Sequence, residues 1–275
     1  MAELEADILS SWVNWDADLV TRPELVHALS GGSSHSSFLV SGLSSRGSTD
    51  YFVVRVENSH NRQLAMPVHQ EVALMRWAKG LAPQVVFQNS LLLVSAYIEA
   101  PQWTPPGQLR TIATGLRELH NLPPPAGLAD FDLLQHCDVY WTQLGQPQRH
   151  HDFYRAWRDQ LDEVLRSYPD RCLCHNDLNP GNMLLHDSTL VLLDWEYAAI
   201  NSPWFDLASL AEFGQLDQRD LQLLSQHYGP DSDLHAIEQF RPVVRLLEWL
   251  WLSLQGATEL AEHSRQRLLQ LQYLQ

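Results

Sequence analysis

The chain has 275 residues, of which 45% are hydrophobic and 19% are charged, and this is the composition of an ordinary globular protein. Its 33 acidic residues outnumber its 18 basic ones, which gives a formal net charge of −15. An acidic chain lacks the broad positive surface that holds a phosphate backbone, so nucleic-acid binding is not expected as its main activity. The most apolar stretches, 91–98 and 243–254, are far shorter than the ~20 residues of a membrane-spanning helix, so no membrane span is expected.

Cysteine usage and the N-terminus indicate the compartment. Cys137, Cys172 and Cys174 are too few and too unevenly spaced for a disulfide framework, which favours a reducing, cytoplasmic environment. Glu3 and Glu5 are not typical of a signal peptide, and none is expected. At roughly 150 residues per domain, the length fits one large domain or two lobes that share a cleft.

The N-terminal part of the chain alternates between apolar runs and turns, which predicts an antiparallel β-meander. Strands are predicted at 25–29, 38–40, 51–56, 84–87 and 91–97. A loop of small residues, 30–37, separates the first two strands, and a short helical segment is expected ahead of them. Apolar residues recur at helical spacing over 63–80, so we expect an amphipathic helix there that Gly80 ends.

Three prolines within 101–106 interrupt this pattern, and we place the boundary between two lobes, 1–98 and 99–275, at this linker. Beyond it the chain is predicted to be mainly helical. The predicted helices are 107–121, 132–145, 150–167, 204–213, 217–228 and 235–273. A β-rich insert at 171–194 is the exception, with two apolar runs that flank a turn at 186–189.

The polar segment 174–182 lies between apolar strands and contains the most informative residues. Asp177, an amide five residues later at Asn182, and the carboxylate of Asp194 after a hairpin offer the oxygen ligands that a divalent cation prefers. Taken singly, such residues are as readily explained as turn formers that satisfy backbone groups. Taken together, the spacing from His175 through Asp177 to Asn182, followed by an aspartate after a hairpin, matches a kinase-type phosphotransfer signature.

On these residues the sequence resembles the aminoglycoside phosphotransferase and choline kinase superfamily. The run His175-Asn176-Asp177 and the segments 194–197 (Asp-Trp-Glu-Tyr) and 205–208 (Phe-Asp-Leu-Ala) are most similar to its choline/ethanolamine kinase and thiamine kinase branches. The resemblance extends over residues 25–260. It implies an α+β, protein kinase-like fold of two lobes: a small antiparallel β N-lobe with one helix, for the nucleotide, and a larger, mainly helical C-lobe for catalysis and the acceptor.

The resemblance implies a role for each residue of the catalytic segment. Asp177 is expected to accept or align the proton of the acceptor hydroxyl, and Asn182 and Asp194 to hold the Mg²⁺ ions that bridge the ATP phosphates. His175 is expected to brace this loop, and Asp206 to hold its backbone from the start of the next helix. Without the resemblance, His175 is a packed hydrogen-bonding residue and Asp206 a carboxylate favoured by the helix dipole.

In the N-lobe, the resemblance implies a flexible loop over the nucleotide phosphates, because glycines allow close backbone approach and their N–H groups can face anions. This loop consists of Ser30, Gly31, Gly32, Ser33 and Ser34. Arg55 occupies the place of the family's phosphate-contacting cation. Glu71 faces the same side as the apolar stripe of its helix, so we expect an Arg55–Glu71 ion pair, the alternative being a surface charge. Ala96 and Ile98 are expected in the hinge that receives the adenine.

More than one acceptor fits the residues that are expected to bind it. Choline kinase-like proteins surround a quaternary ammonium with aromatic and acidic groups. Tyr197, preceded by Glu196, matches one tyrosine of that family, and Glu248 and Trp251 fall near its second aromatic wall. The order Glu-Trp-Leu-Trp at 248–251 departs from the Trp-x-x-Trp of choline kinases, so thiamine, ethanolamine or an aminoglycoside fits as well as choline. Most of the tryptophans are equally explained as helix core.

These observations predict an ATP- and Mg²⁺-dependent kinase that phosphorylates a hydroxyl of a small, cationic metabolite of the thiamine or choline/ethanolamine class. An aminoglycoside O-phosphotransferase is the second hypothesis, because it shares every motif named above. A third hypothesis, from another class, is a kinase-fold protein that binds a nucleotide or metabolite without transferring phosphate. No pattern in the sequence predicts whether ATP or GTP is preferred, and none predicts the oligomeric state.

Overall fold

The computed structural model describes residues 9–29, 35–57, 68–78 and 80–272. The chain divides into two compact units, and each unit is built from two separate stretches of sequence. One comprises Met1–Gln102 with Gly181–Tyr197, and the other Trp103–Pro180 with Ala198–Gln275. The described helices contain no apolar run long enough to cross a membrane.

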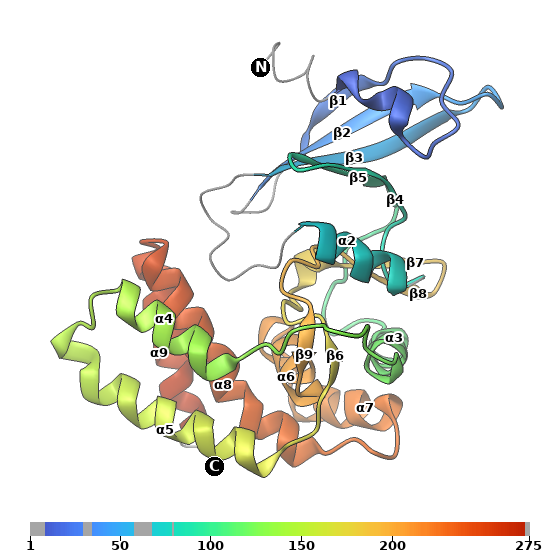
Figure 1. The fold of residues 1–275 in the computed structure, drawn as a ribbon. Helices are drawn as coiled ribbons and strands as arrows, with labels where there is room; N and C mark the ends of the chain where they lie inside the picture. Colours follow the sequence, from blue (N-terminus) through green and yellow to red (C-terminus); the bar gives the residue numbers. More distant parts are fainter. Residues whose placement is uncertain (1–8, 30–34, 58–67, 79, 273–275) are drawn as a thin grey trace. The chain divides into compact units, whose positions relative to one another are not determined.

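The first unit contains a five-stranded antiparallel sheet in the order β1-β2-β3-β5-β4 (Figure 1). Its strands are β1 (Glu24–Leu29), β2 (His35–Leu43), β3 (Thr49–Glu57), β4 (Val85–Gln88) and β5 (Leu92–Ala96). All five lie where the sequence predicts them. The helical segment expected ahead of them comprises, in its described part, the α-helical residues Leu9 and Ser10 and a 3₁₀ turn at Trp12–Asn14.

Side chains along β3 alternate between the apolar core and the opposite face of the sheet. Phe52 and Val54 are buried in a core cluster that includes Trp15, whose ring lies 5.6 Å from that of Phe52. Arg55 points to the opposite face, because neighbouring residues of a strand alternate sides. The sheet therefore buries an apolar face and presents a cation on the other.

A helix and a β-hairpin complete the first unit. Helix α2 spans Val68–Trp77, within the predicted helix 63–80, of which 63–67 and 79 lie outside the described residues. The hairpin consists of β7 (Met183–His186) and β8 (Thr189–Leu192), and the N–H of Leu192 donates to the carbonyl of Leu81, 2.7 Å away. The hairpin is thus attached to the segment that follows α2.

The second unit is mainly helical, with a two-stranded sheet of β6 (Cys172–Cys174) and β9 (Ala199–Asn201). Its helices are α3 (Leu109–Asn121), α4 (Leu133–Gln143), α5 (His151–Ser167), α6 (Pro203–Phe213), α7 (Gln218–Tyr228), α8 (Leu234–Leu254) and α9 (Thr258–Gln272). The prediction of one helix over 235–273 is wrong, because the chain turns at Gly256, whose φ of +70° favours glycine.

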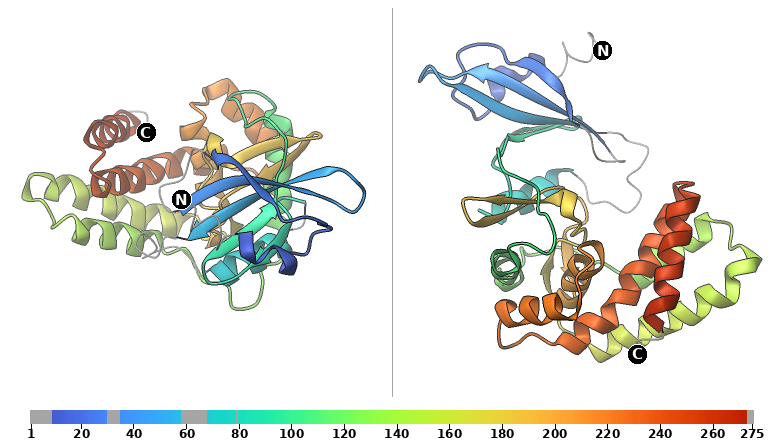
Figure 2. Two further views of the ribbon diagram at one scale, coloured as in Figure 1. Left: turned by 90° about the horizontal axis from the view of Figure 1, so that it is seen from above. Right: turned by 180° about the vertical axis from the view of Figure 1, so that it is seen from behind.

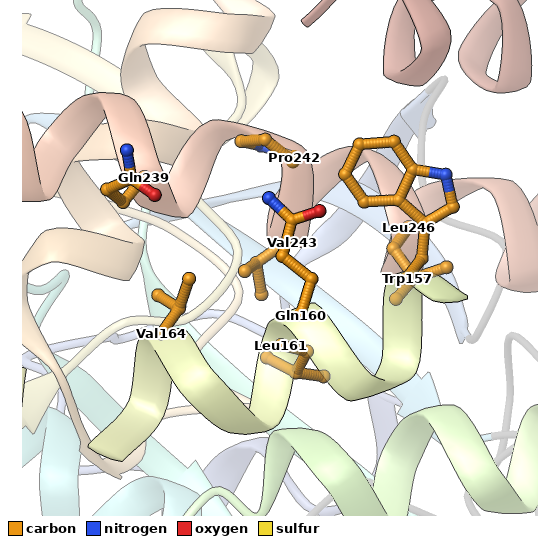
Figure 3. A pocket seen from close by; sticks show the side chains of 8 residues that line it. All are labelled: Trp157, Gln160, Leu161, Val164, Gln239, Pro242, Val243 and Leu246. Atoms are coloured by element: carbon orange, nitrogen blue, oxygen red, sulfur yellow. The ribbon is translucent and has the colours of Figure 1, made fainter. Parts of the chain in front are cut away.

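Helix α6 is the centre of the second unit, since every residue from Pro203 to Glu212 is buried. Gly214 ends this helix against Trp103, and a Cβ at that position would lie 2.5 Å from the indole ring. Helices α8 and α9 run side by side (Figure 2). Helix α5 packs on α8 along an apolar seam in which Trp157 and Leu161 lie near Val243 and Leu246 (Figure 3).

A buried carboxylate on α6 joins these helices electrostatically. The oxygens of Glu212 accept hydrogen bonds from Nε of Arg241 at 2.5 Å and of Arg245 at 2.8 Å, both on α8, and of Arg267 on α9 at 3.1 Å. Burial alone would raise the pKa of Glu212, but the hydrogen bond from Arg267 and the charges of Arg241 and Arg245 lower it overall. The carboxylate is therefore held in its charged form.

Candidate active site

In the second unit, strand β6 leads directly into the segment of His175, Asn176 and Asp177. The carboxylate of Asp206, fully buried in the first turn of α6, accepts hydrogen bonds from the backbone N–H groups of His175 and Asn176, both at 2.8 Å. Asp206 thus holds the backbone of these two residues. His175 is itself completely buried, and its bracing role stays a prediction.

A histidine that the sequence analysis did not select supports Asp206 in turn. His120 Nε2 lies 3.1 Å from an Asp206 carboxylate oxygen, and His120 Nδ1 lies 2.8 Å from the Tyr228 hydroxyl. An ionised carboxylate only accepts hydrogen bonds, so Nε2 donates to Asp206, and in the neutral imidazole Nδ1 then accepts from the tyrosine hydroxyl. The chain Tyr228–His120–Asp206 therefore fixes the position of the loop backbone.

The loop is also held at its centre. Asn176 has a left-handed backbone, with φ of 65°, which asparagine adopts more readily than most residues. Its side-chain oxygen accepts a hydrogen bond from Asn201 Nδ2 at 2.8 Å, from the end of β9. The next residue, Asp177, is half-buried, and its carboxylate accepts from Asn179 Nδ2 at 3.2 Å. The loop thus presents a partly exposed carboxylate on a fixed backbone.

The first unit brings three other predicted residues together. Arg55 on β3 and Glu71 on α2 form the expected ion pair, with one N–O distance of 2.7 Å and a second, shorter contact between Nη2 and Oε2. Glu71 is fully buried and Arg55 is nearly so. A guanidinium nitrogen of Arg55 also lies 3.4 Å from the carboxylate of Asp194. One cation is therefore shared by two carboxylates from distant parts of the sequence.

The β7–β8 hairpin places the two expected magnesium ligands at its open end. Met183 is paired with Leu192, and the next ladder bond runs from the N–H of Leu193 to the carbonyl of Asn182, at 2.8 Å. Asp194 follows directly. An amide and a carboxylate at one end of a hairpin suit a hard cation that prefers oxygen ligands, so this donor set fits Mg²⁺.

Two further ligands lie near Asp194. One ligand atom each of His35, Asp194 and Glu196 lies within 4.8 Å of the others. Two of these three ligand atoms are carboxylate oxygens, which a hard divalent cation prefers. His35 was missed because a histidine in a loop of small residues carries no distinguishing spacing.

The expected hinge residues differ in what their backbones offer. The N–H of Ala96 donates to the carbonyl of Gln84 at 2.8 Å, and that of Tyr97 to the carbonyl of Tyr51 at 3.0 Å. Ile98 N–H has no hydrogen-bond partner among the residues that the structure describes. A ligand that needs a backbone donor here would therefore find it at Ile98. The loop Ser30 to Ser34, predicted to cover the phosphates, lies outside the described residues.

The residues assigned to the acceptor lie in both units. In the first, Glu196 is buried and Tyr197 is half-buried. In the second, Trp251 on α8 is half-buried, while Glu248 on the same helix accepts hydrogen bonds from Arg245 at 2.5 Å and from the Ser264 hydroxyl at 2.6 Å. The charge of Glu248 is thus largely balanced inside the protein.

The fold of the chain is protein kinase-like, as solved structures show. The choline kinase LicA from Streptococcus pneumoniae superimposes with a TM-score of 0.75 at 18% identity, over 98% of both chains. A structure of LicA in complex with AMP gives 0.75 at 18% identity, over 98% of this chain and 96% of that one. An ADP-bound aminoglycoside phosphotransferase gives 0.67 at 18% identity, over 98% of both chains.

The family model described as the phosphotransferase enzyme family matches residues 26–240, so the chain belongs to that family. Among curated relatives, protein LicA of Haemophilus influenzae is 46% identical over 68 residues, which is 25% of this chain and 26% of LicA. The chain thus aligns with about a quarter of that relative. The thiamine kinase of Escherichia coli O157:H7 is 25% identical over 251 residues, or 84% of each protein.

Proposed function

We propose that the protein transfers the γ-phosphoryl group of ATP, with Mg²⁺, to a hydroxyl of a small cationic metabolite of the thiamine or choline/ethanolamine class. The observation that carries this proposal is the cluster of Arg55, Glu71 and Asp194. It combines an oriented guanidinium with an acidic, oxygen-rich hairpin end, and these are the groups that phosphoryl transfer needs. In this assignment, residues 1–98 bind the nucleotide and residues 99–275 carry the catalytic base and part of the acceptor site.

The residues of the first unit would position the nucleotide. Arg55, oriented by Glu71, would contact phosphate oxygens in two places, as a guanidinium does. Asn182 and Asp194 would hold Mg²⁺, which neutralises charge on the transferring phosphate. Ile98 would donate its unused N–H to a ring nitrogen of adenine. The predicted loop Ser30 to Ser34 would cover the phosphates.

Asp177 would act on the acceptor. As the acceptor oxygen bonds to the γ-phosphorus, the bond to the bridging oxygen breaks and ADP leaves. The hydroxyl proton then passes to the Asp177 carboxylate, or to solvent while Asp177 aligns the hydroxyl. His175 and Asp206 do not touch the reacting atoms in this scheme, and they fix the backbone that carries Asp177.

A cationic acceptor is supported by the aromatic and acidic residues Glu196 and Tyr197, and by relatives that are named thiamine kinase and choline kinase. Glu248 supports it less, because Arg245 already neutralises that carboxylate. Trp251 remains a candidate for a wall that contacts the cation through its ring. An aminoglycoside phosphotransferase is the second candidate function, since one such enzyme has the same fold.

The test is an acceptor panel. Purified protein is incubated with Mg²⁺-ATP and choline, ethanolamine, thiamine, aminoglycosides or neutral sugars, while ADP release and the mass of the product are followed. We expect one cationic acceptor to gain a phosphoryl group, and chelation of Mg²⁺ to stop the reaction. Transfer only to an aminoglycoside would select the second candidate. Nucleotide binding without any product would instead indicate a kinase-fold protein that does not transfer phosphate.

A further inference from the structure

A group of sulfur and nitrogen ligands lies next to the loop of Asp177, within the second unit. His120, Cys172 and Cys174 each offer one ligand atom, and these atoms all lie within 4.8 Å of one another. The two cysteines share one side of β6 because residues two apart in a strand point the same way. Their Sγ atoms are 3.5 Å apart, and both are free thiols.

The spacing of these atoms suits a tetrahedral ion. Zinc–sulfur bonds of about 2.3 Å place two thiolates about 3.8 Å apart in a tetrahedral site, so the observed distance requires little movement. Two thiolates balance the charge of a divalent cation, and neutral imidazole adds none. The resulting complex carries no net charge, which lowers the cost of forming it in the protein interior. Cys174 is completely buried, but Cys172 is only half-buried and offers an entry path.

His120 is already prepared to act as a ligand. Its Nε2–H is directed at Asp206, so the lone pair of Nδ1 faces the Tyr228 hydroxyl. A cation bound at Nδ1 would take the place of the hydrogen bond to the Tyr228 hydroxyl, and the bond from Nε2 to Asp206 could remain. A carboxylate behind a coordinating histidine fixes the ring and raises its basicity as a ligand.

We propose that His120, Cys172 and Cys174 form a binding site for a thiophilic divalent cation, and that Zn²⁺ is the ion this donor set fits best. Each thiol releases its proton to solvent when it binds the ion. Burial raises the pKa of Cys174 well above its ordinary value, so without such an ion this thiol is protonated and unreactive at neutral pH. The site is independent of the oxygen ligands that we assign to Mg²⁺.

Occupation of this site would act on the catalytic loop. Asp206 binds His120 on one side and the backbone of His175 and Asn176 on the other, and Cys174 directly precedes that backbone. A bound cation would therefore restrain the loop that carries Asp177. An effect of Zn²⁺ on turnover through this route rests on the proposed function, whereas binding of the cation does not.

The test uses cobalt as a spectroscopic substitute for zinc, with reduced protein that carries no polyhistidine tag. We expect Co²⁺ to produce a thiolate-to-cobalt charge-transfer band that saturates at one equivalent and disappears when Zn²⁺ is added. Cys172→Ser should lower the band by about half and weaken cobalt binding by at least about tenfold, because one of the two thiolates is lost. Cys137→Ser is the matched control, since it removes the buried thiol of α4 and should leave the band unchanged.

Two outcomes would overturn the proposal. One is the absence of a charge-transfer band in folded, reduced wild-type protein. The other is a band that Cys172→Ser leaves at full strength, which would place the ion elsewhere. Cys172 is chosen because its half-buried side chain tolerates serine better than that of Cys174. The magnesium ligands contain no sulfur, so this band reports on the thiol site even if the protein transfers no phosphate.

Discussion

Arg55 and Glu71, 16 residues apart in the sequence, meet in a buried ion pair with two parallel contacts. Either charge alone would destabilise the folded protein, because a buried charge loses its hydration. The ion pair offsets this loss and also fixes the direction of the guanidinium. Nη1 of Arg55, which donates to Glu71, also reaches Asp194, which follows a hairpin far along the chain. The orientation of one arginine therefore connects the sheet, α2 and the hairpin of the first unit.

Replacement of Arg55 by lysine tests whether this orientation matters for activity. Lys keeps the charge but cannot make two parallel contacts, and a hydrogen bond to a charged group contributes ~1.5–3 kcal/mol. We expect Arg55→Lys to lower kcat/KM for ATP by about 10- to 100-fold. Steady-state kinetics measure this. Arg76→Lys, on the exposed side of α2, is the control and should behave as wild type.

Removal of the Asp177 carboxylate tests the assignment of the catalytic base. Asp177→Asn keeps the size of the side chain but cannot accept a proton, so turnover should fall by about 10²- to 10⁴-fold with the fold unchanged. Asp187→Asn is a matched control in the exposed hairpin turn. Circular dichroism verifies the fold. A kcat for Asp177→Asn within twofold of wild type would remove Asp177 from its role.

Asp206 should contribute to stability as well as to activity. In Asp206→Asn, one acceptor oxygen becomes an amide that faces buried N–H groups, and each buried group left without a partner costs ~1–3 kcal/mol. We expect a loss of that size in the free energy of unfolding in urea. Asp220→Asn changes a half-buried carboxylate in the first turn of α7 that accepts a 3.3 Å hydrogen bond from the backbone N–H of Asp217, and it should cost about 1 kcal/mol or less. Equal losses in the two variants would show that the hydrogen bonds of Asp206 add nothing beyond a helix-end charge.

The arginine cluster around Glu212 predicts a pH dependence of stability. The folded-state pKa of Glu212 lies below its ordinary value, so its ionised form stabilises the protein above the unfolded pKa, and this contribution disappears as the pH falls through the folded pKa. Glu212→Gln removes the carboxylate that the three arginines share, although Arg245 keeps its pair with Glu248, and should cost ~3–5 kcal/mol at neutral pH.

The difference between Glu212→Gln and wild type should narrow as the solution becomes more acidic than the unfolded pKa. Urea unfolding at several pH values measures it. Glu262→Gln is the control, because its half-exposed pair with Arg265 lies at the surface, and its effect should be small at every pH. A Glu212→Gln effect that stays constant down to the acid range would contradict the assignment.

Periodicity predicted the strands of the sheet, and with the family resemblance it gave the Arg55–Glu71 pair as one interpretation, the other being a surface charge. Alternation along β3 and helical spacing around Glu71 each fix a side-chain direction from a few neighbouring residues. The break at Gly256 was missed because the apolar pattern continues across it, and the glycine alone does not reveal its left-handed backbone. Strand β9 was missed because it has only three residues and depends on its pairing with β6.

The supporting residues of the loop were beyond sequence reasoning for a different reason. His120 and Asn201 act through contacts with residues 86 and 25 positions away. The only local signal was a histidine on the apolar side of α3, beside Leu116 and Leu119, where a polar side chain needs a buried partner. Glu248 is a different case: it was expected to face a cationic acceptor, but Arg245, three residues earlier on the same helix, pairs with it, and helical spacing alone could have indicated this pair.

The turn of the β7–β8 hairpin determines where the two residues of the proposed metal site lie relative to each other. Asp187 and Ser188 both have left-handed backbones, which gives a two-residue turn and a single register for the strands. One additional residue in β8 would shift that register and turn Asp194 toward the opposite face of the hairpin, and one in β7 would do the same to Asn182. The distance between the oxygen ligands of Asn182 and Asp194 thus depends on Asp187 and Ser188. These two residues lie at the other end of the hairpin and would not contact the ion.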